Sequence, residues 1–180
     1  EELERQWGED FSKHWEAVMA AVTSTAGQVL TEDGDLIDAV FCSTCGGMTE
    51  DVAAVWGGQR PYLTAHSCGY CTHSPRYSGW KRFSLAEAAE RLETNPEQIR
   101  QMEVLGYTAG GRVDTLDLGD RQWKGTEVRS RLGLDSAAFS WLVQGDDLVV
   151  LTLGYGHGVG MCQYGADGLG QAGYTYVDIL

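Results

Sequence analysis

The most restrictive feature of this sequence is the glycine-rich segment GYGHGVGMCQYGADG, residues 154–168. Glycine loses more conformational freedom on folding than any other residue, so such a dense run is costly to order. We expect it where side chains would obstruct the backbone, either at a close crossing of elements or where a ligand lies on the main chain. The segment matches neither the P-loop pattern nor G-x-G-x-x-G, and no lysine is near. It is therefore not predicted to bind phosphate.

The rest of the chain predicts an α+β fold with a mainly antiparallel sheet of hairpins, short helices and a cysteine-stapled loop region. Apolar residues at spacings of three and four indicate an amphipathic helix near the N-terminus. Asp33-Gly34 and Gly145-Asp146 are typical of hairpin turns. The expected elements are helices over 2–22, 84–92 and 124–133 and from 175 onward, hairpins over 28–41, 98–119 and 139–154, and loops over 44–77.

Length and composition limit the possible functions. The 180 residues, 43% of them hydrophobic, are enough for one domain over 1–180. No apolar run is long enough to span a membrane, and no signal-peptide pattern is visible. The chain opens at Glu1 rather than Met and stops within an apolar-patterned element, so we expect a processed chain or a fragment. A net charge of -13 without a basic stripe excludes a nucleic-acid binder and disfavours an anionic membrane surface.

Four cysteines form two C-x-x-C pairs: Cys42, Cys45, Cys68 and Cys71. Thiolates at this spacing can meet around one tetrahedral ion, so the pattern predicts a structural zinc site. The alternative is two disulfides, which suits a domain working outside the cytoplasm. His66 and His73 flank the later pair and are further possible ligands.

The fifth cysteine, Cys162, lies alone in the glycine-rich segment. With His157 five residues before it, a Cys-His nucleophile is one interpretation. A small buried residue that packs where Ser or Ala would also fit is the favoured one.

Residues 154–180 resemble the closing signature of the SpoIID/LytB family, the stage II sporulation D and amidase-enhancer proteins of bacterial cell-wall biology. Residues 25–63 resemble that family's central block, and the region from Gly111 through LGLDSAAF is similar in order and spacing. The resemblance extends over about residues 21–180. Its most specific motif is the glycine-embedded His-x-x-x-Met-x-Gln-Tyr-Gly-Ala that starts at His157.

The resemblance implies an extracytoplasmic, peptidoglycan-directed protein of the cell envelope, truncated here at both ends relative to the family. Sporulation members are lytic transglycosylases, which need one carboxyl group as acid and then base. That glutamate lies in an upstream helical segment which matches nothing in this chain, so the resemblance leaves enzymatic activity open. The alternatives are a noncatalytic amidase enhancer or cell-wall binding module, with a cell-wall amidase as partner, and a zinc-stapled interaction domain.

Glu50, in the loop GGMTE, is the acid adjacent to both recognisable motifs and the candidate catalytic residue. Its alternative role is that of a helix N-terminal acid facing free amides. Thr49, His157, Gln163 and Tyr164 are candidate contacts to sugar hydroxyls and N-acetyl groups. His157 and Gln163 would alternatively satisfy buried backbone groups. We expect Glu50 and His157 to face the same cleft.

Overall fold

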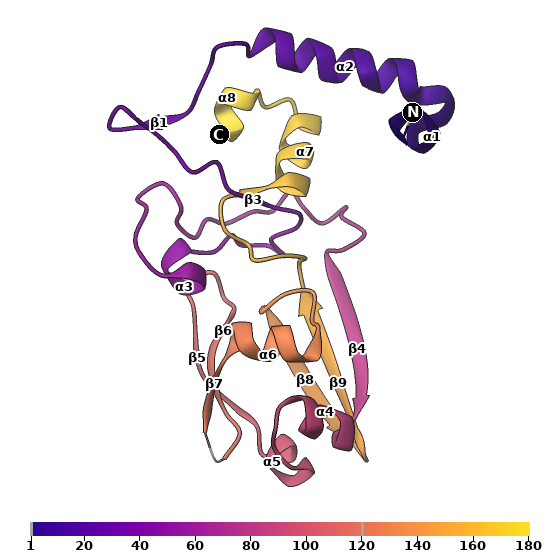
Figure 1. The fold of residues 1–180 in the computed structure, drawn as a ribbon, viewed down its shortest axis with the longest axis vertical. Coiled ribbons are helices and arrows are strands. Elements are labelled where there is room, and N and C mark those ends of the chain that lie inside the picture. The colour runs from indigo at the N-terminus through magenta and orange to yellow at the C-terminus, as the bar shows by residue number, and fades with distance from the viewer. Residues whose placement is uncertain (1, 120) are drawn as a thin grey trace. The chain divides into compact units, whose positions relative to one another are not determined.

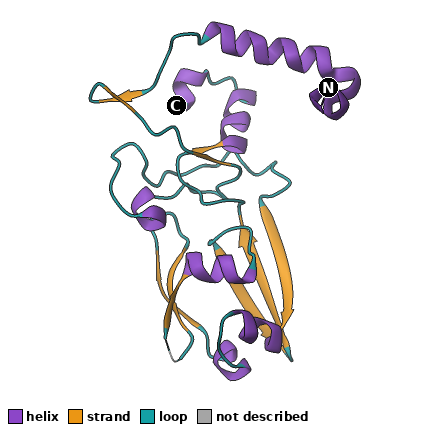
Figure 2. Cartoon of the chain, in the orientation of Figure 1, coloured by secondary structure: helices purple, strands orange, loops and turns teal. Residues whose placement is uncertain are grey.

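The fold is that of a computed structural model, which describes residues 2–119 and 121–180 (Figure 1). It divides into two compact units, residues 1–38 and 39–180. Helices alternate with short strands, as Figure 2 shows, and this confirms the α+β class. None of the described helices has the length and apolar character needed to cross a bilayer.

The helices are α1 (Glu2–Trp7), α2 (Phe11–Ser24), α3 (Val52–Trp56), α4 (Leu85–Arg91), α5 (Pro96–Arg100), α6 (Gly125–Leu132), α7 (Gln163–Gln171) and α8 (Tyr176–Ile179), with a 3-10 turn, η1 (Gly8–Asp10), after α1. The strands are β1 (Thr31–Glu32), β2 (Asp35–Leu36), β3 (Phe41–Cys42), β4 (Ser78–Ser84), β5 (Glu103–Tyr107), β6 (Val113–Asp117), β7 (Gln122–Lys124), β8 (Phe139–Gln144), β9 (Asp147–Leu153) and β10 (Met161–Cys162).

The first unit contains α1, η1, α2 and the β1–β2 hairpin. The helix predicted over 2–22 is interrupted by η1, where Gly8 has a φ of 52°. The turn predicted at Asp33-Gly34 is confirmed, and both residues have positive φ. Its strands are shorter than expected, because β3 pairs with β10 instead of extending the hairpin.

The second unit is built on two three-stranded antiparallel sheets, ordered β4-β9-β8 and β5-β6-β7. Helices α4 and α6 pack against them, and α6 contacts β6 and β7. One continuous core joins these elements, with Trp123, Leu116, Leu132 and Leu148 each at most 2% exposed. Burial of such large apolar side chains is the main favourable contribution to folding, at about 25 cal/mol per Å².

Local sequence signals account for most of these elements. Ser84 caps α4 by accepting from the backbone N–H of Glu87, and Gly133 ends α6 in the left-handed conformation, both as predicted. The hairpin predicted over 98–119 is wrong at its start. Asn95 and Pro96 begin α5 there, and a capping box with Gln98 makes the first residues helical.

The glycine-rich segment crosses the loop that follows β3. Thr44 and Tyr155 exchange backbone hydrogen bonds of 3.2 and 2.8 Å, and β3 pairs with β10 in parallel. A Cβ built on Gly154 would lie 2.6 Å from the carbonyl oxygen of Thr44. Side chains would therefore obstruct this crossing, which confirms the reason for the glycines given above. We call residues 41–50 and 154–162 the loop pair.

Gly154→Ala is expected to destabilise the protein by several kcal/mol, since it adds a backbone clash to the cost of a φ of 77°. Gly145→Ala is the matched control: its φ of 61° carries the same conformational penalty, but nothing lies within 4 Å of its added Cβ. Urea unfolding of both variants measures the difference. Equal losses would show that conformation alone, and not the close crossing, requires the glycine.

Candidate functional site

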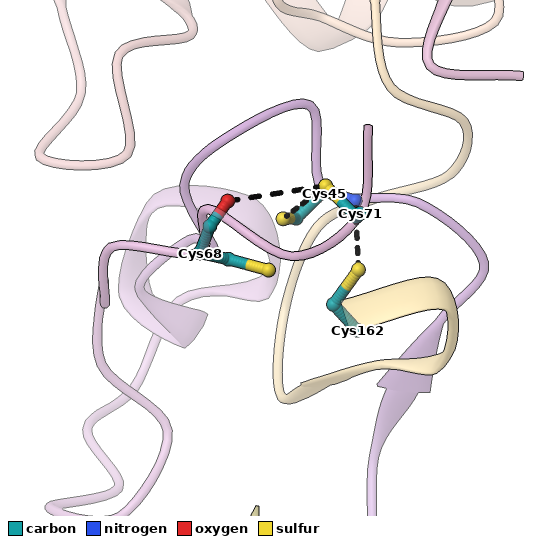
Figure 3. A group of neighbouring side chains, drawn as sticks. All are labelled: Cys45, Cys68, Cys71 and Cys162. Carbon is teal, nitrogen blue, oxygen red and sulfur yellow. Dashed lines mark hydrogen bonds between the residues drawn. The ribbon is translucent and has the colours of Figure 1, made fainter. Parts of the chain in front are cut away.

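Four cysteine sulfurs gather beside the loop pair, all within 4.8 Å of one another: those of Cys45, Cys68, Cys71 and Cys162. Figure 3 shows their side chains pointing toward a common centre. The sulfurs of Cys45 and Cys71 are 3.6 Å apart, well beyond a disulfide bond. All five cysteines of the chain are free thiols here. These four residues, the sulfur cluster, lie close enough to hold a metal ion.

The sulfur cluster differs from the predicted set in one member. Cys162 takes the place expected for Cys42, which is 3% exposed and pairs in register with Cys162 across β3 and β10. The sequence interpretation of Cys162 as a small packing residue missed this, because the parallel pairing that brings residue 162 beside the first C-x-x-C pair is a tertiary feature. Cys162 also caps α7, accepting from the N–H of Gly165.

The thiols of Cys42, Cys45 and Cys68 are hydrogen-bonded to the sulfur of Cys162. Hydrogen bonds donated by Cys42 and then Cys45 hold the pKa of the Cys162 thiol far below its usual range. The reciprocal hydrogen bonds raise the pKa of Cys42 and Cys45 and bring that of Cys68 to about 11. Four sulfurs this close together suit a cation, because a bound metal deprotonates its thiol ligands.

The two histidines considered as further ligands have other partners. His66 Nε2 lies 2.9 Å from the hydroxyl of Thr64, and His73 Nε2 lies 2.7 Å from a carboxylate oxygen of Asp167. Neither belongs to the group of side chains within reach of one ion.

Glu50, at the end of the first segment of the loop pair, is fully buried. Its carboxylate accepts hydrogen bonds from the N–H of Asp51 at 2.8 Å, the N–H of Gly110 at 3.1 Å and the hydroxyl of Thr108. The guanidinium of Arg112 lies 3.7 Å away. Two of its hydrogen-bond donors, Thr108 and Gly110, belong to the β5–β6 hairpin, so the carboxylate ties the loop to that hairpin.

Arg112 was not identified from the sequence, although it organises the region. Its guanidinium is 3% exposed and donates to the carbonyl oxygens of Cys45, Met48 and Gly110 at 3.0, 3.2 and 3.3 Å. The Nε of Arg112 is buried and has no hydrogen-bond partner. Arginine residues in hairpin turns are usually solvated, so no sequence signal marked this one.

Glu50 and His157 line the same small cavity, of about 20 Å³, together with Arg112. Nδ1 of His157 accepts from the N–H of Val159 at 3.1 Å, and its ring lies 4.8 Å from that of Trp56. Burial lowers the pKa of His157, and the nearby Arg129 and Arg112 lower it further. We call this space the polar cavity.

The other predicted sugar contacts lie elsewhere. Thr49 is 7% exposed, and its hydroxyl accepts from the N–H of His66 at 2.7 Å. Gln163 is exposed at the start of α7, and Tyr164 packs on the sulfur cluster. Among the predicted contacts, His157 alone lines the polar cavity.

An open groove of about 550 Å³ adjoins the polar cavity and shares Ala54, Thr108 and Asp114 with it. Gln59, Arg60 and Tyr107 are among the other residues that line this groove. Tyr107 is 66% exposed. The groove thus offers an aromatic ring and hydrogen-bonding side chains to a ligand that reaches the cavity.

Two curated relatives cover nearly the whole chain. Stage II sporulation protein D of Bacillus subtilis (strain 168) is 37% identical over 99% of this chain and 52% of its own length. Stage II sporulation protein D of Bacillus amyloliquefaciens is 34% identical with the same coverage. The amidase enhancer of Bacillus subtilis (strain 168) is 26% identical over 89% of the chain and 30% of its own length.

The resemblance to the SpoIID/LytB family is confirmed. The chain spans about half the length of the stage II sporulation proteins that it matches. No family model matches it. The homologous stretch includes both segments of the loop pair, and with them the sulfur cluster and the polar cavity.

Glu50→Gln is expected to lower the free energy of unfolding by about 3–5 kcal/mol, because it leaves Arg112 buried without its counter-charge. The control is Glu87→Gln, which removes a carboxylate 44% exposed and paired with Arg91 on α4. We expect a change within about 1 kcal/mol there. Urea unfolding measures both. A loss at Glu50→Gln no larger than the control would contradict a structural role for this pair.

Proposed function

We propose that this domain acts at the bacterial cell wall, outside the cytoplasm, and binds glycan strands of peptidoglycan. The observation that carries the proposal is the homology to stage II sporulation protein D over 99% of the chain. The homology to the amidase enhancer supports the proposal as well, because the name of that protein implies an enzyme partner. A cell-wall amidase is accordingly the protein partner that we propose.

The groove beside the polar cavity is the proposed glycan site. A sugar ring presents an apolar face that packs on an aromatic side chain and hydroxyls that bond to its polar neighbours. Exposed Tyr107 supplies the aromatic face, and Gln59 and Arg60 supply polar groups along the same groove. His157 extends this set into the cavity, where its ring rests against Trp56.

The proposed activity is lytic transglycosylase-like. We expect the chain to bind glycan strands but to cleave them poorly. Cleavage requires a carboxylic acid that can give a proton to the glycosidic oxygen. Glu50, the candidate acid, is fully buried and receives hydrogen bonds from three donors. This arrangement favours an anchoring role over proton donation and fits the alternative of a noncatalytic enhancer or binding module.

Pull-down with glycan strands stripped of their peptides tests the proposed site. Tyr107→Ala is expected to weaken binding several-fold, because it removes the exposed ring of the groove. Trp80→Ala is the control, since Trp80 is 70% exposed on β4 and does not line the groove. Failure of the wild-type chain to bind would overturn the proposed function, and equal binding by both variants would overturn the location.

The same strands distinguish binding from cleavage. We expect the chain to release anhydro-ended products slowly, since loss of a general acid typically costs about 10² to 10⁴ in rate. Product mass after prolonged incubation is the measurement. Rapid release that is abolished in a folded Glu50→Gln variant would instead assign catalysis to Glu50.

We further propose that the sulfur cluster holds a structural zinc ion. Four thiolates at about 2.3 Å from zinc lie about 3.8 Å from one another in a tetrahedron. The 3.6 Å separation of the Cys45 and Cys71 sulfurs is close to that value. Such an ion would fasten the loop pair to residues 67–71 and to the start of α7.

Native mass spectrometry is expected to find one zinc ion per chain, lost on chelation. Cys162→Ser should abolish zinc retention, whereas Cys42→Ser should keep it, because Cys42 lies outside the four-sulfur group. The reverse result would restore the ligand set predicted from the two C-x-x-C pairs. A mass that increases on reduction but does not change when a chelator is added would establish disulfides instead.

A further inference from the structure

The polar cavity contains more positive than negative charge, although the protein as a whole is acidic. Arg112, Lys124 and Arg129 line it together with Glu50 and Asp114. Both acids are already paired, Glu50 with Arg112 at 3.7 Å and Asp114 with Lys124 at 3.0 Å. Arg129 is therefore the cationic residue of the cavity lining that has no acidic partner within the lining.

Arg129, on α6, is half-buried and has no carboxylate within ion-pairing distance among the described residues. Its Nε donates to the carbonyl oxygen of Leu134 at 3.3 Å. Burial, and next the charge of Arg112, lowers the pKa of Arg129, with a weaker opposing effect of Asp135. Asp135 is itself shared with Arg76, which lies 3.6 Å from it. A half-buried guanidinium without a close counter-ion is costly unless a ligand neutralises it.

Arg112 provides a second, independent sign of a missing partner. It is 3% exposed, lines the same cavity, and its Nε is a buried donor without an acceptor. Buried donors in folded proteins nearly always have acceptors, so an unpaired one in a cavity wall marks a place for an oxygen atom. The cavity volume of about 20 Å³ is enough for about one oxygen atom, so the rest of a larger ligand would lie in the adjoining groove.

We propose that Arg129 and Arg112 form a subsite for a carboxylate carried by the glycan, the lactyl carboxylate of its muramic acid residues. The inference rests on the proposed function. The guanidinium of Arg129 matches the planar, two-oxygen geometry of a carboxylate. Arg112 adds one donor, its Nε, because its other nitrogens already donate to carbonyl oxygens. In a strand stripped of peptides the lactyl carboxylate is the negatively charged group of the repeating unit. A sugar in the groove would direct it past Thr108 and Asp114, the residues common to groove and cavity.

Two ligands decide this for the wild-type chain: stripped glycan strands, and the same strands with their carboxyl groups chemically reduced to alcohols. We expect reduction to weaken binding about tenfold or more, the usual effect of losing a charge-assisted hydrogen bond. Equal affinity for both would overturn the carboxylate subsite and leave the proposed glycan function standing. Binding of neither would overturn the proposed function, and this inference with it.

Arg129→Gln is expected to bind the native strands as weakly as the wild-type chain binds the reduced ones, and to lose the difference between the two ligands. Arg131→Gln is the matched control, because it removes the same charge two positions along α6 from a side chain paired with Glu93 at 2.8 Å. It should behave as wild type. A similar loss in both variants would assign the effect to net charge and contradict the subsite.

Strands that keep their peptides separate the two sources of carboxylate. In them the lactyl group is consumed in an amide bond, and the carboxylates that remain belong to the peptide. Weaker binding of these strands than of stripped ones is expected. Tighter binding would assign the arginines to a peptide carboxylate and overturn the lactyl assignment. The ligand comparisons use the wild-type chain, so they hold even if Arg129→Gln is unstable.

Discussion

The buried contact between Arg112 and the loop around Glu50 is the interaction on which the rest of the site depends. One guanidinium binds carbonyl oxygens of Cys45, Met48 and Gly110 and lies beside the Glu50 carboxylate. Desolvating both charges is costly, and the attraction between them repays it only when further hydrogen bonds satisfy both groups. Glu50 obtains those bonds from Asp51 in its own loop and from Thr108 and Gly110 in the β5–β6 hairpin, so the loop and the hairpin are held in one arrangement.

This contact and the sulfur cluster act on the same segments. Cys45 contributes its sulfur to the cluster and its carbonyl oxygen to Arg112. A loop region with a small apolar core of its own, centred on Val52, Leu63 and Val159, obtains much of its order from these polar and sulfur contacts. Order of this kind would lower the entropy cost of the proposed glycan binding, which is the advantage of a preorganised site.

The sequence predicted what depends on neighbouring residues and missed what depends on the crossing of distant ones. The Ser84 cap, the Gly133 stop and the turn at Asp33-Gly34 are local, and all three are present. The exchange of Cys42 for Cys162 and the burial of Arg112 follow from the parallel pairing of β3 with β10 and from the packing of a hairpin turn onto a loop. Spacing within one segment carries no information about either. Helix α7 was missed for a similar reason: its glycines lower helix propensity, but Gly165 lies where a Cβ would be 2.5 Å from the Cys68 sulfur.

The glycines serve the sulfur cluster and the polar cavity in the same way: without side chains, their backbone can approach the Cys68 sulfur and the Arg112 guanidinium closely. At Gly165 the backbone of α7 reaches the sulfur cluster, and at Gly158 it passes against the guanidinium of Arg112, 2.0 Å from where a Cβ would stand. The Cys68 sulfur and the guanidinium of Arg112 therefore both lie directly against the backbone of residues 158–165. Among the described residues, no group accepts from the Arg112 Nε, and no carboxylate lies within ion-pairing distance of Arg129. The proposed carboxylate subsite would supply an anionic oxygen to both of these side chains, which line the polar cavity.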